Sequence, residues 1–428
     1  MTTRPWMSES ARNRESAIVE TVADASTDDV RRSIDQLVAD NREIHERRSL
    51  NLNPATNVMN PRAEAVLAAG LGSRPSLGHP GAKYEVGLEA IEELEVITAE
   101  LAGRVFGSAF NEIRVFSGAM ANLTTFMACA KPGDAIIVPP PSIGGHVTHN
   151  TAGAAGLYGL DIHEAPIDPD RYTLDVEGVA QLAERVRPKL ITVGASLNLL
   201  PHPVAELRTI ADQVGAHLLF DAAHACGMIA GGEWPNPLVE GAHVMTMSTY
   251  KSLGGPAGGL IVTDDVELGT KIDAIAYPGL TANFDAGRTT ALAITLLDWI
   301  EHGAAYAAEM VASASALAAA LERADVRVFR TTHGPTTSHQ FAATPPVGSS
   351  ADDAVARLAA ANLLTCAIGT PAGDAVRIGT PEAVRWGMTS DDMDTLAGFI
   401  ADGLGDVPGV GDAVTAWRAP FDRVHFCT

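Results

Sequence analysis

The chain has 428 residues, a length for which two or three packed units are more usual than one hydrophobic core. Hydrophobic residues make up 46% and aromatic residues only 5%, which favours an α/β protein built on small aliphatic side chains over an all-β one. The formal net charge of −22 argues against nucleic acid or an anionic membrane as a partner, because phosphate groups attract basic patches.

The first ten residues, MTTRPWMSES, lack the apolar segment of a secretory signal, and no uncharged apolar run reaches membrane-spanning length. The four cysteines are scattered, which fits free thiols better than disulfides or a zinc site. We therefore expect a cytoplasmic protein without a bound metal.

Residues 1–48 are polar and charged, with helical stretches such as DDVRRSIDQLVADNREIHERR, and predict an N-terminal helical arm. Residues 49–300 alternate helical patterns with short apolar runs: EIRVF, DAIIVPP, KLITVGAS, HLLFDAA, HVMTMS and GGLIVTD. Such alternation predicts a large α/β domain with a mostly parallel sheet covered on both faces. An alanine-rich helical region, about 288–323, leads into a smaller C-terminal α+β domain, residues 301–428.

Ligands of open α/β sheets lie beyond the carboxyl ends of the strands, so the residues there are the candidates for function. After EIRVF comes SGAMAN, a small turn opening a helix, whose free N–H groups suit phosphate. After AIIVPPPS comes IGGHVTHN, with His146 and His149 three residues apart. No third ligand has a suitable spacing for a metal, whereas an imidazole can stack on a flat ring.

Two charged residues end the next strands. Asp221 follows the apolar run HLLF, where a carboxylate is costly unless it is paired, although a helix N-cap is an equally simple interpretation. Lys251 follows VMTMSTY, thirty residues further on. A phosphate turn, a flat-ring partner, a buried aspartate and a lysine together indicate pyridoxal 5′-phosphate (PLP). The lysine forms the Schiff base, and the aspartate keeps the pyridine nitrogen protonated.

With these residues in place, the sequence resembles the serine hydroxymethyltransferases, which are fold-type I PLP enzymes of the aspartate aminotransferase type. The resemblance extends over about residues 50–387, in GHPGAKY, SGAMANLTTFMACAKPGDAIIV, GGHVTHN, DAAHACGMIAGGEWPNP, STYKSLGGPAGGLIV and RIGTPEAVRWGMTSDDM. It implies a large domain of the seven-stranded type, a smaller C-terminal domain and covalent PLP on Lys251.

The resemblance also implies roles for individual residues. Those expected to contact the cofactor are Ser117, Gly118, Ala119, His146, Ser196, Asp221, His224, Ser248, Lys251 and Asn283. Those expected to take part in catalysis are Lys251, Asp221 and His146. Tyr250 and Glu85, which differ from the family, are added as new titratable groups near the substrate, although a packed ring and a salt bridge are equally simple interpretations of them. Those expected near the substrate are Arg377, Tyr84 and Ala55. Arg377 matches the arginine that pairs with the substrate α-carboxylate, for which a guanidinium fork is suited.

Several positions depart from the family pattern. The glutamate that serves folate-dependent hydroxymethyl transfer is replaced by Leu77, and leucine cannot transfer a proton. The remaining changes replace a tyrosine by Pro75, the second tyrosine of a pair by Glu85, a histidine by Tyr250, serines by Ala55 and Ala119, and the loop GGQGGP by GLTANF. The scaffold is kept while the acid–base groups differ, so we expect tetrahydrofolate not to take part.

Three functions remain open at this point. One is a PLP enzyme of altered specificity, acting on an α-amino acid or amino-acid conjugate through an external aldimine by elimination, decarboxylation or aldol-type chemistry. Its setting would be specialised antibiotic metabolism, such as the processing of cysteine conjugates in lincosamide pathways. The second is a true serine hydroxymethyltransferase or threonine-aldolase-like enzyme, and the third a non-catalytic binding protein. The resemblance further implies a homodimer with shared active sites.

Overall fold

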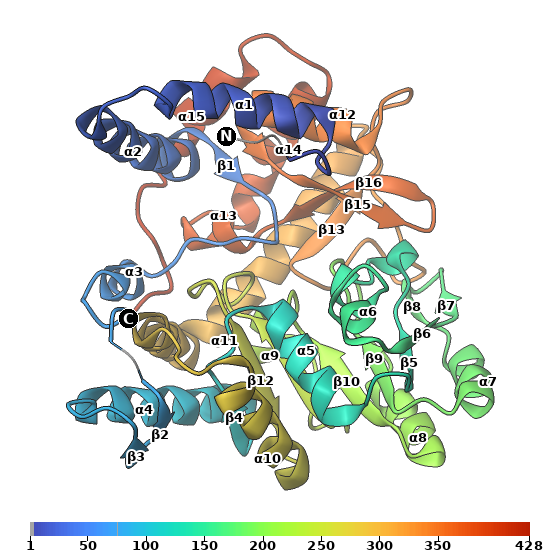
Figure 1. The fold of residues 1–428 in the computed structure, drawn as a ribbon. Helices are drawn as coiled ribbons and strands as arrows, with labels where there is room; N and C mark the ends of the chain where they lie inside the picture. Colours follow the sequence, from blue (N-terminus) through green and yellow to red (C-terminus); the bar gives the residue numbers. More distant parts are fainter. Residues whose placement is uncertain (1–3, 75) are drawn as a thin grey trace.

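The computed structural model describes residues 4–74 and 76–428, so the interpretation of Pro75 lies outside the described residues. Its centre is a seven-stranded sheet in the order β4-β12-β11-β10-β9-β5-β6 (Figure 1). The strands are β4 (Phe110–Glu112), β5 (Ala135–Val138), β6 (Asp161–Glu164), β9 (Leu190–Val193), β10 (His217–Asp221), β11 (Val244–Ser248) and β12 (Gly259–Thr263). Strand β12 runs in the opposite direction to the other six strands of this sheet, so the predicted fold-type I architecture with a mostly parallel sheet is confirmed.

Both faces of the sheet are apolar because successive side chains of a strand point to opposite sides. On β10, Leu219 belongs to one hydrophobic cluster and Phe220 to the other. On β11, Val244 belongs to the same cluster as Leu219, and Met245 to the same cluster as Phe220. This two-sided burial explains why these strands read as continuous apolar runs rather than as alternating ones.

The helices that accompany the sheet are α4 (Glu89–Phe106), α5 (Gly118–Cys129), α6 (Ala154–Tyr158), α7 (Val176–Val186), α8 (Val204–Val214), α9 (Cys226–Ala230) and α10 (Val266–Ala274). Helix α5 packs on β11 and β12, whereas α8 packs on β9 and β10. Four short strands lie outside the large sheet: β2 (Gly78–His79), β3 (Ala82–Lys83), β7 (Ile167–Asp168) and β8 (Thr173–Leu174).

The run EIRVF, predicted as a strand, pairs in the sheet only at its first residue, Glu112. The following carbonyl groups find other partners. Arg288 Nη1 donates to the carbonyl oxygen of Val115 at 2.8 Å, and the N–H of Gly259 donates to the same oxygen at 3.1 Å. These bonds replace a strand partner and lead the chain into α5.

Helix α11 (Ala286–Arg323) contacts α3 (Pro61–Leu67), α4 and α14 (Met393–Leu404) and joins the sheet to the C-terminal elements (Figure 1). Asp285 caps its first turn by accepting the N–H groups of Gly287 and Arg288. By length and hydropathy it is the one helix of the described residues that could cross a membrane, but half of its apolar window is buried inside the fold. Its apolarity is therefore that of a core helix.

The C-terminal elements are β13 (Gln340–Ala343), α12 (Ala351–Ala360), β14 (Leu363–Leu364), β15 (Cys366–Thr370), β16 (Gly373–Gly379), α13 (Pro381–Arg385), α14 and α15 (Val410–Arg418). Strands β13, β16 and β15 form an antiparallel sheet, which lies at the opposite end of the molecule from β4 (Figure 1). Strand β1 (Leu50–Asn51) pairs with β14. The expected boundary at residue 300 falls inside α11, and the division into three parts stays a prediction.

Residues 9–42 form two helices, α1 (Glu9–Val22) and α2 (Thr27–Arg42), each capped by a serine side chain. Apolar side chains of α2, namely Ile34, Leu37 and Val38, are 56–63% exposed. The two helices therefore bury little of their own apolar surface within one chain.

Candidate active site

A cavity of about 110 Å³ lies where the carboxyl ends of the parallel strands meet. Its lining residues are Ser117, Gly118, Ala119, Asn122, His146, Ala195, Ser196, Asp221, Ala223, His224, Ser248, Tyr250 and Lys251. All of these except Asn122, Ala195 and Ala223 are residues that the sequence predicts for the site. Segments that are distant along the chain thus converge on one cavity, as the strand-end argument requires.

Asp221 is the last residue of β10, is 5% exposed and has each carboxylate oxygen hydrogen-bonded. Oδ2 lies 2.8 Å from His149 Nε2 and accepts from Asn122 Nδ2 at 2.9 Å, while Oδ1 accepts from the N–H of Ala223 at 3.0 Å. Burial alone would raise the pKa of Asp221, but these hydrogen bonds outweigh it and hold the pKa well below its usual range. The residue is therefore a fixed negative charge at the cavity wall.

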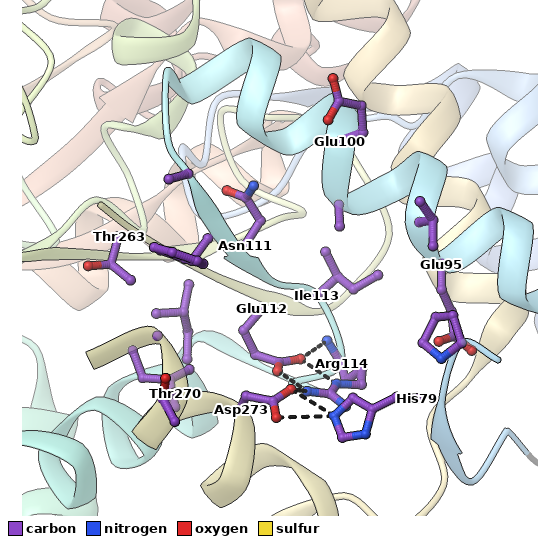
Figure 2. Close-up of a pocket in the computed structure, with 18 residues that line it drawn as sticks. His79, Glu95, Glu100, Asn111, Glu112, Ile113, Arg114, Thr263, Thr270 and Asp273 are labelled. Carbon is purple, nitrogen blue, oxygen red and sulfur yellow. Dashed lines mark hydrogen bonds and ion pairs between the residues drawn. The ribbon is translucent and has the colours of Figure 1, made fainter. Parts of the chain in front are cut away.

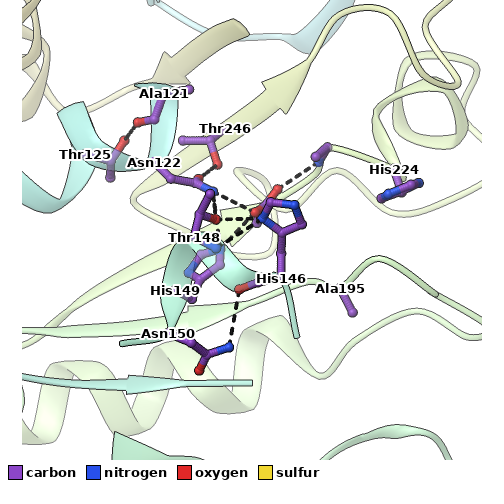
Figure 3. Close-up of polar contacts among 12 residues, drawn as sticks. Ala121, Asn122, Thr125, His146, Thr148, His149, Asn150, Ala195, His224 and Thr246 are labelled. Atoms are coloured by element: carbon purple, nitrogen blue, oxygen red, sulfur yellow. Dashed lines mark hydrogen bonds and ion pairs between the residues drawn. The ribbon is translucent and has the colours of Figure 1, made fainter. Parts of the chain in front are cut away.

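Sequence reasoning missed the two side chains that hold this charge. Figure 3 shows His149 and Asn122 converging on the same point, with His146 beside them. Asn122 also accepts from Thr246 Oγ1 at 2.7 Å and donates to Thr148 Oγ1 at 3.0 Å, so its amide orientation is determined from both ends. The signal was present, because His149 is the second histidine of the HxxH pair and Asn122 ends the turn SGAMAN.

Lys251 follows β11 and is 6% exposed, with Nζ 3.0 Å from His224 Nε2. Burial lowers the pKa of Lys251 to about 8, and the positive charge of Arg377 acts in the same direction. Burial and the charges of Lys251 and Arg377 likewise hold the pKa of His224 well below 6.5. At neutral pH the cavity therefore contains a neutral imidazole beside an amine that loses its proton unusually easily.

The N-terminus of α5 forms another wall. Ser117 is its N-cap, and Oγ of this residue accepts from the N–H of Met120 at 3.1 Å. A Cβ on Gly118 would lie 2.2 Å from Ser248 Oγ, so a glycine is needed where this turn approaches β11. The unpaired N–H groups of a first helical turn attract an anion, and the turn faces the same cavity as Lys251.

His146 caps the short turn after β5, with Nδ1 2.9 Å from Thr148 Oγ1. Burial lowers its pKa, so the ring is neutral at neutral pH. Figure 3 shows the imidazole near His149 and Thr148. It lines the same cavity as Asp221, so its role in stacking on a flat ring stays a prediction.

Arg377 on β16 approaches the cavity from the C-terminal sheet and is 7% exposed. Its Nη1 donates to the carbonyl oxygen of Ser196 at 2.5 Å and lies 3.4 Å from His224 Nε2. The predicted carboxylate-binding arginine thus lies next to the residue that contacts Lys251.

Besides Arg377, which only approaches it, four predicted residues do not line this cavity. Tyr84 is 82% exposed, and Glu85, its neighbour, has a buried Oε2 without a hydrogen-bond partner in the described part of the chain. Asn283 Oδ1 accepts from the N–H of Ser76 at 3.2 Å. The N–H of Ala55 donates to Asn53 Oδ1 at 3.1 Å.

A larger cavity, about 590 Å³, lies beside α4, β4 and α10 (Figure 2). Its one arginine is paired with carboxylates: Arg114 Nη2 lies 2.6 Å from Asp273 Oδ1, and His79 Nε2 lies 3.1 Å from the same carboxylate. None of the predicted site residues line it. Among residues 4–74 and 76–428, no cluster of three or more metal-ligating side chains occurs.

The cavity around Lys251 fits PLP by the chemistry of its groups. A lysine with a lowered pKa suits an aldehyde, and an ionised, buried aspartate suits a protonated pyridine nitrogen. A helix N-terminus suits a phosphate, and His224 Nδ1 is buried without a partner in the part of the chain that the structure describes. Lys251, Asp221, Ser117, Gly118 and His146 are the residues that would hold the cofactor.

The fold and this cavity define a fold-type I PLP-dependent enzyme. Comparison with known proteins narrows the class, because the family model of serine hydroxymethyltransferase matches residues 28–400. The chain is 56% identical to an alpha-methylserine aldolase of Variovorax paradoxus over 99% of its own length and 98% of the relative. It is 35% identical to a serine hydroxymethyltransferase of Methanopyrus kandleri over 89% of its own length and 91% of that relative. The chain belongs to the serine hydroxymethyltransferase family.

Proposed function

We propose that this protein is a PLP-dependent aldolase that breaks the Cα–Cβ bond of α-methylserine without folate. The observation that carries the proposal is the similarity to alpha-methylserine aldolases, at 52–58% identity over 96–99% of this chain. Similarity to serine hydroxymethyltransferases is lower, at 34–36% over 88–89%. Aldol-type chemistry is one of the reactions that the sequence left open.

The atoms of this reaction balance without another reactant. The β-hydroxyl proton leaves, the Cα–Cβ bond breaks, Cβ departs as formaldehyde and Cα gains a proton to give alanine. PLP, when bound, accepts the electron pair left at Cα into its conjugated ring. Arg377 binds the carboxylate and so orients Cα, and Asp221 keeps a negative charge beside the ring nitrogen.

Within one chain, the described side chains that line the cavity offer no free carboxylic acid for the aldol reaction. Among the described lining residues Asp221 is the one carboxylate, and its oxygens are held by other donors. Leu77 occupies the position of the family's glutamate and cannot exchange a proton. The hydroxyl proton would pass to a neutral imidazole of the cavity, to water or, in a homodimer with shared sites, to the Glu85 carboxylate of the second copy.

A direct test uses the PLP-loaded protein and both enantiomers of α-methylserine, with alanine and formaldehyde measured together. We expect equal amounts of the two products, no requirement for tetrahydrofolate, and loss of turnover in Lys251→Ala. Serine with tetrahydrofolate is the second arm. If methylene-tetrahydrofolate forms rapidly while α-methylserine is inert, the protein is an ordinary serine hydroxymethyltransferase and the proposal is wrong.

We propose further that the active protein is a homodimer with shared sites. The exposure of Tyr84, at 82%, and of Val86, at 97%, supports this, as do the apolar side chains left open on α2. A segment with such exposed side chains, here the one that follows β3, is suited to contact a second copy. The predicted cytoplasmic location and role in antibiotic metabolism, lincosamide pathways included, remain predictions.

Mixed dimers test the shared sites. Lys251→Ala and Glu85→Ala protomers, each of low activity alone, are mixed, dissociated and reassociated. If Glu85 serves the partner's site, mixed dimers contain one intact site and about a quarter of wild-type activity returns. If no activity returns although the dimers form, Glu85 does not act across the interface.

A further inference from the structure

Cys366 lies directly beside the predicted carboxylate-binding arginine. It is the register partner of Arg377 in the antiparallel pair of β15 and β16. Its sulfur is 3.2 Å from Nε and 3.2 Å from Nη2 of Arg377, and the thiol donates to Asn53 Oδ1 at 3.1 Å. A neutral thiol has one donor and one weak acceptor, and both functions are used here.

The contacts of Arg377 leave a defined set of free donors. A guanidinium has five N–H groups, and two edges on which a carboxylate can make two parallel hydrogen bonds. Cys366 occupies the Nε–Nη2 edge, and the carbonyl oxygen of Ser196 takes one N–H of Nη1. One N–H on Nη2 remains free, and the second N–H of Nη1 has only a long contact of 3.4 Å with His224 Nε2, which a carboxylate can replace. These two N–H groups form the second edge.

The free edge lies on the side of the reacting lysine. Nη1 is 3.4 Å from His224 Nε2, and the same nitrogen of His224 is 3.0 Å from Lys251 Nζ. A carboxylate bound at Nη1 and Nη2 is therefore held next to the position where the substrate amine reacts. A carboxylate bound at the Nε–Nη2 edge would be displaced towards β15.

We propose that Cys366 is a positioning residue that reserves the Nη1–Nη2 edge of Arg377 for the substrate carboxylate. By fixing that edge it fixes the rotation of the substrate about Cα, and so favours cleavage of the Cα–Cβ bond over the Cα–carboxylate bond. The choice of bond rests on the proposed function, whereas the choice of edge concerns any α-amino acid ligand.

Cys366→Ala removes the sulfur and frees the competing edge, whereas Cys366→Ser keeps a small acceptor that can receive an N–H. Cys427→Ala is the matched control, because Cys427 also lies beside an arginine, 3.5 Å from Arg385 Nη2, but that arginine pairs with Asp298 and does not contact His224. Thermal unfolding of all three PLP-free variants verifies that they fold.

Ligand binding is measured by calorimetry with alanine, which has the carboxylate, and with ethylamine, which lacks it. We expect Cys366→Ala to weaken alanine binding about 10-fold, because the hydrogen bonds between Arg377 and the carboxylate are then less well oriented. Ethylamine binding should not change. Cys366→Ser should recover most of the affinity, and Cys427→Ala should bind both ligands as the wild type does. Equal weakening for both ligands, or no weakening, would overturn the proposal.

A second readout follows the fate of α-methylserine. We expect the ratio of released CO₂ to formaldehyde to rise in Cys366→Ala and to stay at the wild-type value in Cys427→Ala. An unchanged ratio would overturn the orientation argument. Wild-type protein that releases no formaldehyde would refute the proposed function, while the alanine and ethylamine affinities would still decide the role of Cys366.

Discussion

His149 Nε2 lies 2.8 Å from Asp221 Oδ2, and both side chains are almost completely buried. This contact joins the two strand ends that the sequence singled out separately, the HxxH pair after β5 and the aspartate that ends β10. It gives the second histidine a task that does not involve a metal. The pair fixes the carboxylate that lines the cavity, so we expect PLP retention to depend on a residue that does not line it.

Removal of this donor should weaken PLP binding. In His149→Phe the aromatic ring keeps the packing against Phe126, whose ring centroid lies 5.4 Å from that of His149, but Asp221 loses one donor. A hydrogen bond to a charged group contributes about 1.5–3 kcal/mol, so we expect the PLP dissociation constant to rise about 10- to 150-fold. Fluorescence titration of the PLP-free protein measures it, and His149→Gln, which can still donate, should lose less.

The same variant predicts a change in acid stability. The pKa of Asp221 is depressed below its ordinary value of 3.8 in the folded state, so its stabilising effect exists above that pH and disappears as the pH falls. His149→Phe should therefore unfold more easily than the wild type near pH 7, and the difference should shrink below about pH 4. A difference independent of pH would point to packing alone.

Much of the fold was predictable because apolar runs bounded by turns mark buried strands directly. HLLF and VMTMS became β10 and β11. The edge strand β6, with the sequence DIHE, was missed because its side chains are exposed or half-buried and the run is polar. Pairing at an edge depends on the neighbouring strand rather than on local composition.

The site was predictable for residues such as Asp221 and Lys251, because a residue at the carboxyl end of a parallel strand lies at the ligand-binding edge of the sheet. Asn122 and His149 were missed because they reach Asp221 from 99 and 72 residues away. The contact of Cys366 with Arg377 follows from the register of two antiparallel strands. Such contacts depend on tertiary pairing, which the spacing of residues in the sequence does not specify.

Lys251→Met should stabilise the PLP-free protein at neutral pH. The pKa of Lys251 falls from 10.5 to about 8 on folding, so the unfolded chain binds more protons between these values. The buried charge costs about 3 kcal/mol below pH 8, and this cost disappears as the pH rises towards 10.5. Urea unfolding at several pH values should show the variant's advantage shrinking from pH 8 upward. A constant advantage would mean that removal of the charge is not the cause.

Gly118→Ala tests the close approach of α5 to β11. The added methyl group would lie 2.2 Å from Ser248 Oγ, and overpacking of this kind costs about 1–3 kcal/mol. Ser248→Ala in the same chain should recover the stability but not the PLP affinity, because the cavity has then lost the hydroxyl group. Gly398→Ala in α14 is the control, since nothing lies within 4 Å of its new methyl group. If the double variant binds PLP like the wild type, Ser248 has no part in holding the cofactor.

Leu77→Glu tests whether the missing acid separates this protein from folate-dependent relatives. Leu77 is half-buried just before the β2–β3 hairpin, so a polar side chain should be tolerated there. A positioned acid–base group contributes about 10²–10⁴-fold to such a reaction, and since other residues also differ, we expect a gain of about 10-fold in methylene-tetrahydrofolate formation from serine.

Leu77→Gln is the matched control, because glutamine has the same shape and hydrogen-bonding reach as glutamate but cannot transfer a proton. Cleavage of α-methylserine should change little in either variant. An equal gain in Leu77→Gln would show that polarity rather than acidity matters at this position, whereas loss of α-methylserine cleavage in both would place Leu77 in the substrate's path.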